Sequence, residues 1–495
     1  MKILLVYPEC PNTFWNLRHA MKFISKKATL PPLGLLTVAS MLPKEWEKKL
    51  VDMAVAKLSD KDIKWADYVF ISAMYIQKES VKDVITRCKR LGVKIVAGGP
   101  LFTAAPEYFG AVDHLVLNEA EITLPPFLKD LSEGCPKHVY TSDTRADMKK
   151  SPTPLWGLTG YKKYASMCIQ YSRGCPFSCD FCDITMLFGN KMRLKTKDQI
   201  LTELDGLYSQ GWKGPVFVVD DNFIGNKREL KKEVLPAIIR WMEEKEYPFT
   251  FNTQASINLS DDEELMGLMV KAGFDAVFVG IETTEEEGLS ECDKVQNKNR
   301  DLIACVKKIQ EFGLQVQGGF ILGFDSDHAL TFGKLIEFIQ KSGIVTAMVG
   351  LLNAPRGTKL YNRLSQAGRL LNDSTGNNTD LSMNFVPKMN YEQLIDGYKK
   401  VISTIYSPKN YYERVLTLFK TYRPLQGGKI HFHFYNIKAL FKSMWSLGLV
   451  GKERLYYWKL ILWTLFRRPE LLQQAITFAI YGYHFRKTFS NYCQI

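Results

Sequence analysis

The chain has 495 residues and a mass of 56.7 kDa, more than one hydrophobic core usually serves, so two or three domains are expected. A composition of 46% hydrophobic and 24% charged residues excludes an intrinsically disordered chain. The net charge of +13 is confined to the C-terminal part: from residue 398 onward there are 16 Lys and Arg against 3 Asp and Glu, whereas residues 1–397 carry 49 of each sign.

The chain opens with MKILLVYPEC, whose apolar run is too short for a signal peptide and is typical of a buried first strand. No uncharged apolar stretch reaches about 18 residues, so we expect no membrane span. Together these features predict a cytoplasmic protein. Thiols stay reduced in the cytoplasm, which favours metal or catalytic roles for clustered cysteines over disulfides.

Residues 1–145 alternate between short apolar runs and helical patterns, and we interpret them as the first domain. Repeated βα units of this kind predict a doubly wound, Rossmann-like parallel sheet with its ligand at the carboxyl ends of the strands. The predicted strands have the sequences KILLVYP, KLVDMAV, YVFISAM, KIVAGGP and HLVLNEAE. The strand ends expected to face the ligand are 8–9, 72–74, 98–100 and 118–121.

A polar, Pro-containing passage at 146–160 is predicted to be a linker, and a second βα series follows over 161–360. Its apolar runs are CIQYSRGC, PVFVVDDNF, FTFNTQAS, AVFVGIET, LQVQGGFILGF and IVTAMVGLLN, with helices such as 227–246 between them. Six strands are fewer than the eight of a full barrel, so we expect a partial (β/α)6 barrel. Residues 361–495 are predicted to be mainly helical, and the run KIHFHFYNI at 429–437 fits no predicted element.

Three cysteines are clustered in the loop YSRGCPFSCDFCDI, where Cys175, Cys179 and Cys182 are spaced by four and three residues. Soft thiolates on one flexible turn suit an iron–sulfur cluster, in which three of four irons would be ligated and the fourth would be open to a small molecule. A structural zinc site would need a fourth Cys or His at metal spacing, but the next histidine is His328. Three unrelated structural thiols are the remaining interpretation.

The C-x3-C-x2-C spacing at the end of the first barrel strand, with Phe181 just before the last cysteine, resembles the radical S-adenosylmethionine (radical SAM) superfamily. The resemblance implies that Cys175, Cys179 and Cys182 ligate a 4Fe-4S cluster. The open iron of this cluster would bind S-adenosylmethionine, which one electron cleaves to a 5′-deoxyadenosyl radical. The residues implied to contact S-adenosylmethionine are Phe181, Asp221 in DDNF, Gln254, Glu282 in GIET, and Gly318 and Gly319 in GGF. Strand-end polar residues or turn glycines without a ligand are the alternative for the last five.

A doubly wound domain ahead of such a barrel resembles the cobalamin-binding domain of class B radical SAM enzymes, on the motifs PPLG, ISAM, GGP and NEAE. The residues implied to contact cobalamin are Pro32, Leu33, Ser72, Met74, Gly98, Gly99 and Glu119. The D-x-H-x-x-G motif of other cobalamin proteins is absent, and His19, the nearby candidate ligand, is better explained as a solvated loop residue. A nucleotide-binding or structural α/β domain is the alternative, although no G-x-G-x-x-G follows the first strand.

Residues 1 to about 415 are similar to the subgroup that includes the hopanoid C-2 methylase, on stretches such as GIETTEEEGLSECDKVQNKNRDL and LLNAPRGTKLYNRL. This resemblance implies a methyltransferase acting on an unactivated carbon of a hydrophobic substrate, such as a hopanoid or another lipid. It also implies that a flavodoxin or ferredoxin supplies electrons. The alternatives are a radical rearrangement or oxidative cyclisation without methylation, and a non-catalytic cobalamin carrier or sensor with a structural cluster.

The C-terminal region mixes Trp, Tyr and Phe with Lys and Arg and contains almost no acids. This mixture suits the headgroup zone of an anionic membrane, so peripheral association with the inner face of the membrane is expected. Aromatic side chains packed on the barrel with solvated lysines are the alternative. Nucleic acid is disfavoured as a partner because no RNA-binding module is apparent.

Overall fold

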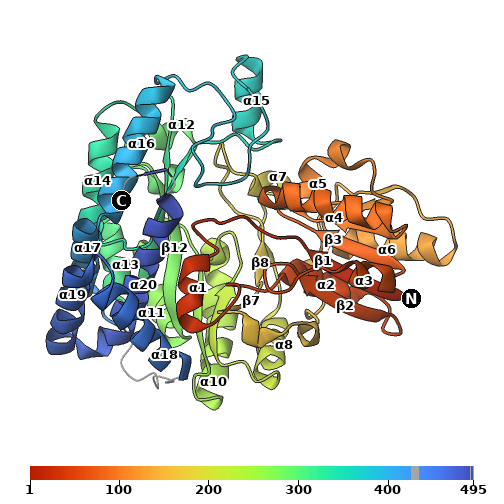
Figure 1. Ribbon diagram of the computed structural model, residues 1–495, viewed down its shortest axis with the longest axis horizontal. Coiled ribbons are helices and arrows are strands. Elements are labelled where there is room, and N and C mark those ends of the chain that lie inside the picture. The colour runs from red at the N-terminus through yellow and green to blue at the C-terminus, as the bar shows by residue number, and fades with distance from the viewer. Residues whose placement is uncertain (425–433, 491, 494–495) are drawn as a thin grey trace.

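The computed structural model describes residues 1–424, 434–490 and 492–493. Two six-stranded parallel sheets, a two-stranded antiparallel sheet of β8 (Ser172–Arg173) and β9 (Arg193–Leu194), and a group of C-terminal helices are the main features of this part of the chain (Figure 1). The predicted α/β class, with a doubly wound first part, a partial barrel and a helical C-terminal region, is therefore confirmed. The run at 429–437 lies largely outside the described residues.

The first sheet is doubly wound. Its strands are β1 (Lys2–Tyr7), β2 (Glu47–Asp52), β3 (Tyr68–Ser72), β4 (Lys94–Gly98), β5 (His114–Val116) and β6 (Val139–Tyr140), in the order β2-β1-β3-β4-β5-β6. Helices α2 (Leu33–Met41) and α6 (Ala120–Ser132) cover one face, and α3 (Asp60–Trp65), α4 (Lys78–Arg90) and α5 (Pro100–Ala104) cover the other. The order reverses at β1, which pairs with both β2 and β3, and such a switch point opens a ligand crevice at the carboxyl ends of the strands.

The second sheet is an open barrel. Its parallel strands are β7 (Met167–Ile169), β10 (Gly214–Val218), β11 (Phe249–Gln254), β12 (Phe274–Glu282), β13 (Gln315–Leu322) and β14 (Ala347–Leu351), which pair in chain order. Along β12 the fully buried Val277, Val279 and Ile281 alternate with Phe278 and Gly280, which are only half-buried. The two faces of the strand therefore differ, one packed against the outer helices and the other lining the barrel interior.

Helices form the outer layer of the barrel. They are α8 (Lys197–Ser209), α10 (Leu235–Glu244), α11 (Glu263–Lys271), α12 (Glu286–Glu291), α13 (Leu302–Glu311) and α14 (Thr331–Ser342). The single helix expected over 227–246 is instead α9 (Lys227–Glu229), a π-helical turn (Leu230–Val234) and α10. Pro236, in the first turn of α10, has no amide hydrogen to donate to the preceding turn, which accounts for the interruption.

The C-terminal helices follow the last barrel strand. They are α15 (Lys359–Gln366), α16 (Tyr391–Tyr406), α17 (Pro408–Thr421), α18 (Phe434–Ser443), α19 (Arg454–Arg467) and α20 (Leu472–Phe489). Helices α16 and α17 pack against α14 of the barrel, whereas α15 lies against the cysteine loop, where Arg363 pairs with Asp180. Helix α1 (Arg18–Ile24), which follows β1 in the chain, lies against α18 and α20 rather than on the first sheet (Figure 1). None of the helices in the described ranges combines the length and apolarity needed to cross a lipid bilayer.

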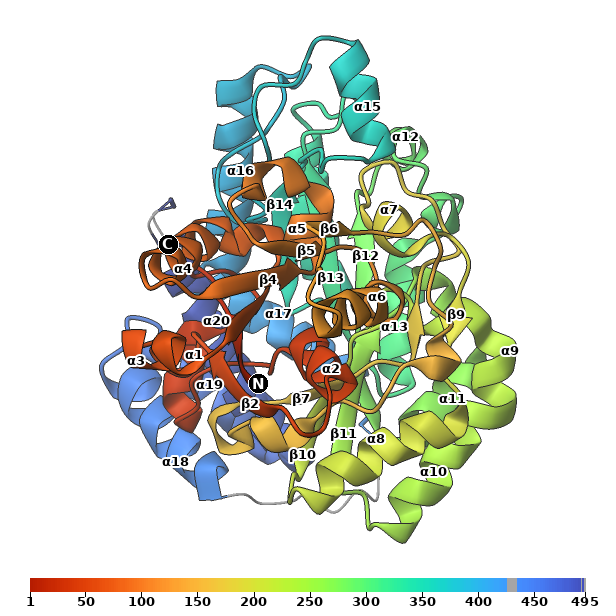
Figure 2. The same ribbon diagram turned by 90° about the vertical axis from the view of Figure 1, so that its right-hand side faces the viewer.

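The first sheet and the barrel face each other. Seen from the side of the first sheet, its strands and helices lie in front of the barrel strands (Figure 2). Between β6 and β7 the chain runs through three single-turn 3-10 helices, Met148–Lys150, Trp156–Leu158 and Tyr161–Lys163. This arrangement leaves the loops after the strands of both sheets between the two layers, where ligands bind in folds of this kind.

Candidate active site

The cysteine loop follows the first barrel strand. It lies between β8 (Ser172–Arg173) and the short helix α7 (Ile184–Phe188), and the Cys182 amide donates to the Cys179 carbonyl at 3.2 Å. Gly174 opens the loop with φ of 93°, and a side chain there would come within 2.7 Å of the Lys191 carbonyl oxygen. Only glycine fits this conformation and this space, so the backbone directs the following cysteine into the loop.

The three predicted cluster thiols lie together and are half-buried. Burial raises the pKa of Cys175, Cys179 and Cys182, and the neighbouring thiolate of Cys179 adds to the effect at the other two. The side-chain amides of Asn222 and Gln296 lie 4.0 Å from the sulfur atoms of Cys175 and Cys179, respectively. Both amides can donate to a sulfur that carries negative charge, as a cluster ligand does.

The ion pair of Glu282 and Lys294 lies beside the thiols. Glu282 ends β12 at a break in register with φ of 66°, a strained conformation for a non-glycine residue, and its Oε1 accepts from Lys294 Nζ at 2.7 Å. The side-chain amide of Asn297 holds this strand end by donating to the carbonyls of Gly280 and Ile281. Burial alone would lower the pKa of Lys294, but the charges of Glu282 and Cys179 raise it above its usual range. Sequence reasoning predicted Glu282 and missed Lys294.

Two adjacent aspartates end β10 on the same side of the barrel. Asp220 is fully buried and accepts from the Tyr171 amide at 2.8 Å and from the Ser172 hydroxyl. Burial raises its pKa to about 7. The pKa of the predicted Asp221 is also raised to about 7, by burial and by the charges of Asp220 and Asp183. A carboxyl group with such a pKa can hold or release a proton near neutral pH.

The other residues predicted to contact S-adenosylmethionine differ in their surroundings. Phe181 packs partly buried against the barrel core, and Gln254 ends β11 beside Phe278. A Cβ on Gly318 would meet the Phe320 ring at 2.8 Å, and one on Gly319 would meet the Phe278 ring at 2.7 Å. The glycines therefore make room for protein aromatic rings, and their contact with adenine stays a prediction.

Trp15, which sequence reasoning did not select, reaches the barrel interior from the loop after β1. Its indole lies edge-on to Phe278 with 5.2 Å between ring centroids. His19, expected in a solvated loop, is instead in α1 with its ring 5.6 Å from that of His484 in α20. The expectation that His19 is a loop residue was thus wrong, because α1 forms only through its contacts with the C-terminal helices.

Most of the residues predicted to contact cobalamin lie along the carboxyl edge of the first sheet. Ser72 and Gly98 are register partners at the ends of β3 and β4, and Gly99 lies against the Ser72 hydroxyl. Met74 is exposed just beyond β3. Pro32 and Leu33 begin α2, the helix that packs against β1 at the switch point. The exception is Glu119, whose carboxylate is bound by two arginine side chains.

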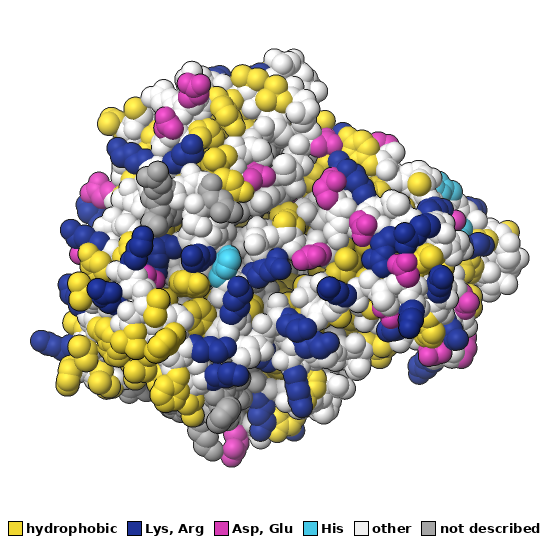
Figure 3. All heavy atoms as spheres, viewed as in Figure 1, with side chains coloured by type: hydrophobic (Ala, Val, Ile, Leu, Met, Phe, Trp, Pro, Cys, Tyr) yellow, Lys and Arg dark blue, Asp and Glu magenta, His cyan; other side chains and the backbone are white. Residues whose placement is uncertain are grey.

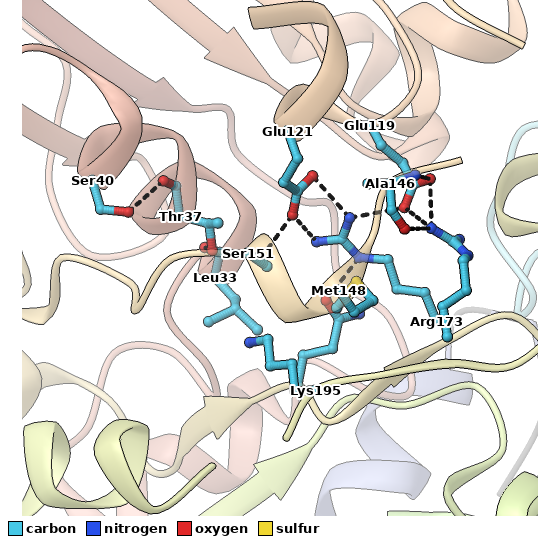
Figure 4. Close-up of polar contacts among 12 residues, drawn as sticks. Leu33, Thr37, Ser40, Glu119, Glu121, Ala146, Met148, Ser151, Arg173 and Lys195 are labelled. Carbon is cyan, nitrogen blue, oxygen red and sulfur yellow. Dashed lines mark hydrogen bonds and ion pairs between the residues drawn. The ribbon is translucent and has the colours of Figure 1, made fainter. Parts of the chain in front are cut away.

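Glu119 belongs to a buried ionic network that joins the two sheets (Figure 4). Its oxygens accept from Arg173 Nη1 at 2.9 Å, from Arg193 Nη1 at 2.8 Å and from the Ala146 amide. Arg173 also donates to Glu121 through both terminal nitrogens, at 3.0 and 2.8 Å. Burial would raise the pKa of Glu121, but Arg173 lowers it, so this carboxylate is ionised at neutral pH. With the Glu119 side chain bound in this way, only its backbone is free for the predicted cobalamin contact.

A second set of polar contacts joins the layers at another point. Arg356, after β14, donates to Glu107, to the Tyr108 hydroxyl and, at 2.6 Å, to Asp373. The Tyr108 hydroxyl in turn donates to Asp373 at 2.6 Å. Glu107 and Tyr108 belong to the 3-10 turn Pro106–Phe109 of the first domain. Two separated polar links therefore fix the loops of the first sheet over those of the barrel.

The residues present fit a 4Fe-4S cluster and S-adenosylmethionine. Three soft donors share one loop, as a 4Fe-4S cluster with one iron open to a small molecule requires. The buried oxygens Gln296 Oε1, Asn297 Oδ1 and Asn353 Oδ1 have no hydrogen-bond partner among the described residues. Such acceptors suit the ammonium and hydroxyl groups of S-adenosylmethionine.

The residues at the carboxyl edge of the first sheet fit cobalamin. His114, His138, His328 and His484 each bond to an atom of their own surroundings, and His19 packs beside His484. Within the described part of the chain, these five histidines are thus placed for other contacts. The small and flexible side chains of Ser72 and Met74 leave the edge of β3 accessible.

Three known families match successive parts of the chain. The B12 binding domain family matches residues 23–128, and the radical SAM superfamily matches residues 169–339. A domain of unknown function (DUF4070) matches residues 358–495. The fold and the site thus define a radical SAM enzyme that carries a B12-binding domain, with cobalamin, S-adenosylmethionine and a 4Fe-4S cluster as its cofactors.

The chain is similar over nearly its whole length to named proteins. It is 39% identical to an uncharacterized methyltransferase, sll1242, of Synechocystis sp., over 98% of this chain and 91% of that protein. It is 33% identical to the hopanoid C-2 methylase of Rhodopseudomonas palustris, over 94% and 90% of the two chains. The chain belongs to the cobalamin-dependent radical SAM methyltransferase family that includes this methylase.

Solved structures share the fold. The cobalamin-dependent radical enzyme OxsB, with aqua-cobalamin and S-adenosylmethionine bound, aligns with a TM-score of 0.63 at 17% identity, over 99% of this chain and 84% of that one. The methyltransferase TsrM from Kitasatospora setae, with cobalamin and a [4Fe-4S] cluster bound, aligns with a TM-score of 0.62 at 15% identity, over 99% of both chains.

Proposed function

We propose that the protein transfers a methyl group from S-adenosylmethionine to an unactivated carbon of an apolar, lipid-like substrate, with a hopanoid as the first candidate. The observation that carries the proposal is the cysteine loop, which begins two residues after Arg173 and is held by that arginine against the carboxyl edge of the B12-binding sheet. This contact supports a site in which the residues proposed to hold the cluster lie next to those proposed to hold cobalamin.

The substrate class is supported by two observations. The relative named hopanoid C-2 methylase is similar over almost the full chain. In addition, Trp15 and Phe278 bring aromatic surface into the barrel interior, and Met74 adds an exposed apolar side chain at the edge of β3. An apolar wall of this kind suits a substrate without charged groups and keeps water from the reacting carbon.

When bound, the cluster, S-adenosylmethionine and cobalamin supply electron transfer, radical generation and methyl carriage. The chain supplies the surroundings: Cys175, Cys179 and Cys182 hold the irons, and the Lys294 ammonium offsets the negative charge of the thiolates. Asp221, with a pKa of about 7, is the proposed group for holding a proton at the end of β10. A flavodoxin or ferredoxin is the proposed electron donor.

The test is anaerobic incubation of the reconstituted protein with cobalamin, a strong reductant, S-adenosylmethionine bearing a trideuteromethyl group, and a bacterial lipid extract. We expect a trideuteromethyl group in a triterpenoid fraction analysed by mass spectrometry. The Cys179→Ala variant should give none, whereas Cys305→Ala, which alters a half-buried cysteine outside the loop, should behave as the unaltered protein does.

The alternatives give other results. Release of 5′-deoxyadenosine without label in any lipid would favour a radical rearrangement or cyclisation. No cleavage of S-adenosylmethionine, in a preparation that holds its iron, would favour a cobalamin carrier or sensor.

A further inference from the structure

Exposed apolar side chains are concentrated on two of the C-terminal helices. Among the described residues, seven large apolar side chains are more than 60% exposed, and five of them lie between 441 and 466. They are Phe441 at 66%, Trp445 at 65%, Val450 at 67%, and Leu455 and Phe466 at 78%. A folded protein rarely leaves so much apolar surface in one place unless a partner covers it.

These side chains form one surface. On α18 and the π-helical turn that follows it (Met444–Leu449), Ile437, Phe441, Trp445 and Leu449 recur every four residues and are all exposed. On α19, Leu455, Leu462, Leu465 and Phe466 are exposed at helical spacing. Residues at these spacings share a face of their helix.

Two hydrogen bonds hold the helices side by side. Trp458 Nε1 donates to the Gly448 carbonyl at 2.9 Å, and the hydroxyls of Ser443 and Tyr457 lie 3.0 Å apart. Figure 3 shows a broad apolar patch in this part of the molecule, with Lys and Arg side chains along its border. We name it the α18–α19 surface and define it by Ile437, Phe441, Trp445, Leu449, Val450, Leu455, Leu462, Leu465 and Phe466.

The charge around this surface is positive. Residues 437–467 contain six Lys and Arg and one acid, Glu453. Glu453 is buried and accepts from Arg486 Nη2 at 2.8 Å, so it does not reduce the exposed positive charge. Five of the bases are exposed, namely Lys438, Lys452, Arg454, Lys459 and Arg467.

We propose that the α18–α19 surface docks the protein on the headgroup region of an anionic phospholipid bilayer. The apolar side chains would enter the boundary between headgroups and acyl chains, and the surrounding bases would pair with lipid phosphates. Charge complementarity selects this occupant. A second copy of the chain would bring two positive borders together, and a nucleic acid would meet aromatic and aliphatic side chains where its phosphates require bases.

The proposal does not depend on the substrate. It concerns where the protein lies, and it would hold equally if the substrate were not a lipid. Binding to vesicles can therefore be measured with reconstituted full-length protein in the absence of substrate and S-adenosylmethionine, so that its failure is distinct from failure of the methyltransferase assay.

The test is flotation of the protein with phosphatidylcholine vesicles prepared with and without phosphatidylglycerol. We expect the protein to float with the anionic vesicles, to stay behind with phosphatidylcholine alone, and to be released by high salt. The triple variant Phe441→Ser/Leu455→Ser/Phe466→Ser should lose at least about tenfold in bound fraction, because each substitution removes a large apolar group from the bilayer. Lys452→Glu/Lys459→Glu should bind less and lose its salt dependence.

The matched control is Leu330→Ser/Leu371→Ser, which removes two apolar side chains of 67% and 59% exposure elsewhere on the molecule. This variant should float as the unaltered protein does. Unchanged thermal unfolding and iron content verify that each variant is folded.

Three results would overturn the proposal. The first is no flotation with anionic vesicles, and the second is equal flotation of the triple variant. The third is that the unaltered protein does not bind vesicles and that the triple substitution instead changes its oligomeric state or abolishes binding to a nucleic acid. That outcome would assign the surface to a second copy or to a nucleic acid.

Discussion

At the scale of single residues, the site depends on a buried cation beside three thiols. Lys294 and Glu282 are both largely buried, and their charges compensate each other 2.7 Å apart. The thiolates required for iron binding add negative charge at the same point. In this buried site the ammonium attracts them more strongly than it would at the protein surface. Glu282 keeps its strained backbone because Lys294 and Asn297 hold the end of β12 in place.

The Lys294→Met variant should lose iron and fail to cleave S-adenosylmethionine. Removing one partner of a buried ion pair leaves the other charge unpaired, at a cost of roughly 3–5 kcal/mol. Iron content after anaerobic reconstitution and desalting is the measurement. The double variant Lys294→Met/Glu282→Gln, which leaves no unpaired carboxylate, should recover part of the iron. Full iron in the single variant would contradict this account.

The sequence predicted the thiols because their spacing is local: a loop that brings Cys175, Cys179 and Cys182 together needs no other part of the chain. Lys294 lies 12 residues beyond Glu282, and only the fold of the intervening segment, which includes α12, returns it to the cysteine loop. The contact of Trp15 with Phe278 is even harder to predict, because the two residues are remote from each other in the chain. Contacts of this kind have no local signal.

At the scale of elements, the segment leading into α6 holds the start of the cysteine loop in position. Glu119 and Glu121 hold Arg173, and Arg173 ends the short strand β8 that leads into the loop. The planar guanidinium binds the two oxygens of Glu121 through two nitrogens at once, a geometry that an ammonium lacks.

The Arg173→Met variant should loosen the contact between the two sheets. Buried Glu121 would lose its ion-pair partner and Glu119 one of its two arginines, with a destabilisation of roughly 3–5 kcal/mol. Arg300→Met, which breaks a more exposed pair with Asp261, should cost less than about 1 kcal/mol. Hydrogen–deuterium exchange of residues 118–122 and 171–175 is the measurement. Arg173→Lys should not restore protection. Equal exchange in the Arg173 and Arg300 variants would show that the network does not join the layers.

Most elements could be predicted from the sequence, and the exceptions have physical causes. The buried strands are continuous apolar runs because both faces of each sheet are covered, and this signal is strong. Helix α1 was missed because seven residues form a stable helix only when packed against others. The side chain of Glu119 was misjudged because its partners, Arg173 and Arg193, lie in the other layer.

At the scale of the whole molecule, the loop after β1 joins the first sheet to the C-terminal helices. The Phe14 ring stacks on Phe485 with 4.2 Å between centroids, and His484 Nε2 donates to the Phe14 carbonyl at 3.1 Å. Burial lowers the pKa of His484 to about 4, so the ring is neutral in the folded protein at physiological pH.

Acid should weaken this contact. Because the pKa of His484 is 6.5 when unfolded and about 4 when folded, its contribution to stability is complete above pH 6.5 and is lost as pH falls toward 4. At about pH 5 the loss is roughly 2 kcal/mol. The midpoint of thermal unfolding should therefore fall more between neutral pH and about pH 5 in the unaltered protein than in His484→Gln. Equal shifts in the two proteins would contradict the assignment.

The contact between Phe14 and His484 spans 470 residues of sequence. During synthesis, the loop after β1 leaves the ribosome long before its partner helix α20 has been translated. The first sheet can fold early, since its strands and helices are contiguous in the chain. The Phe14 side chain, in contrast, stays exposed to solvent until α20 has been synthesised. Chaperones that bind exposed aromatic side chains would have their longest opportunity at this loop, and premature termination before residue 472 would leave it permanently uncovered.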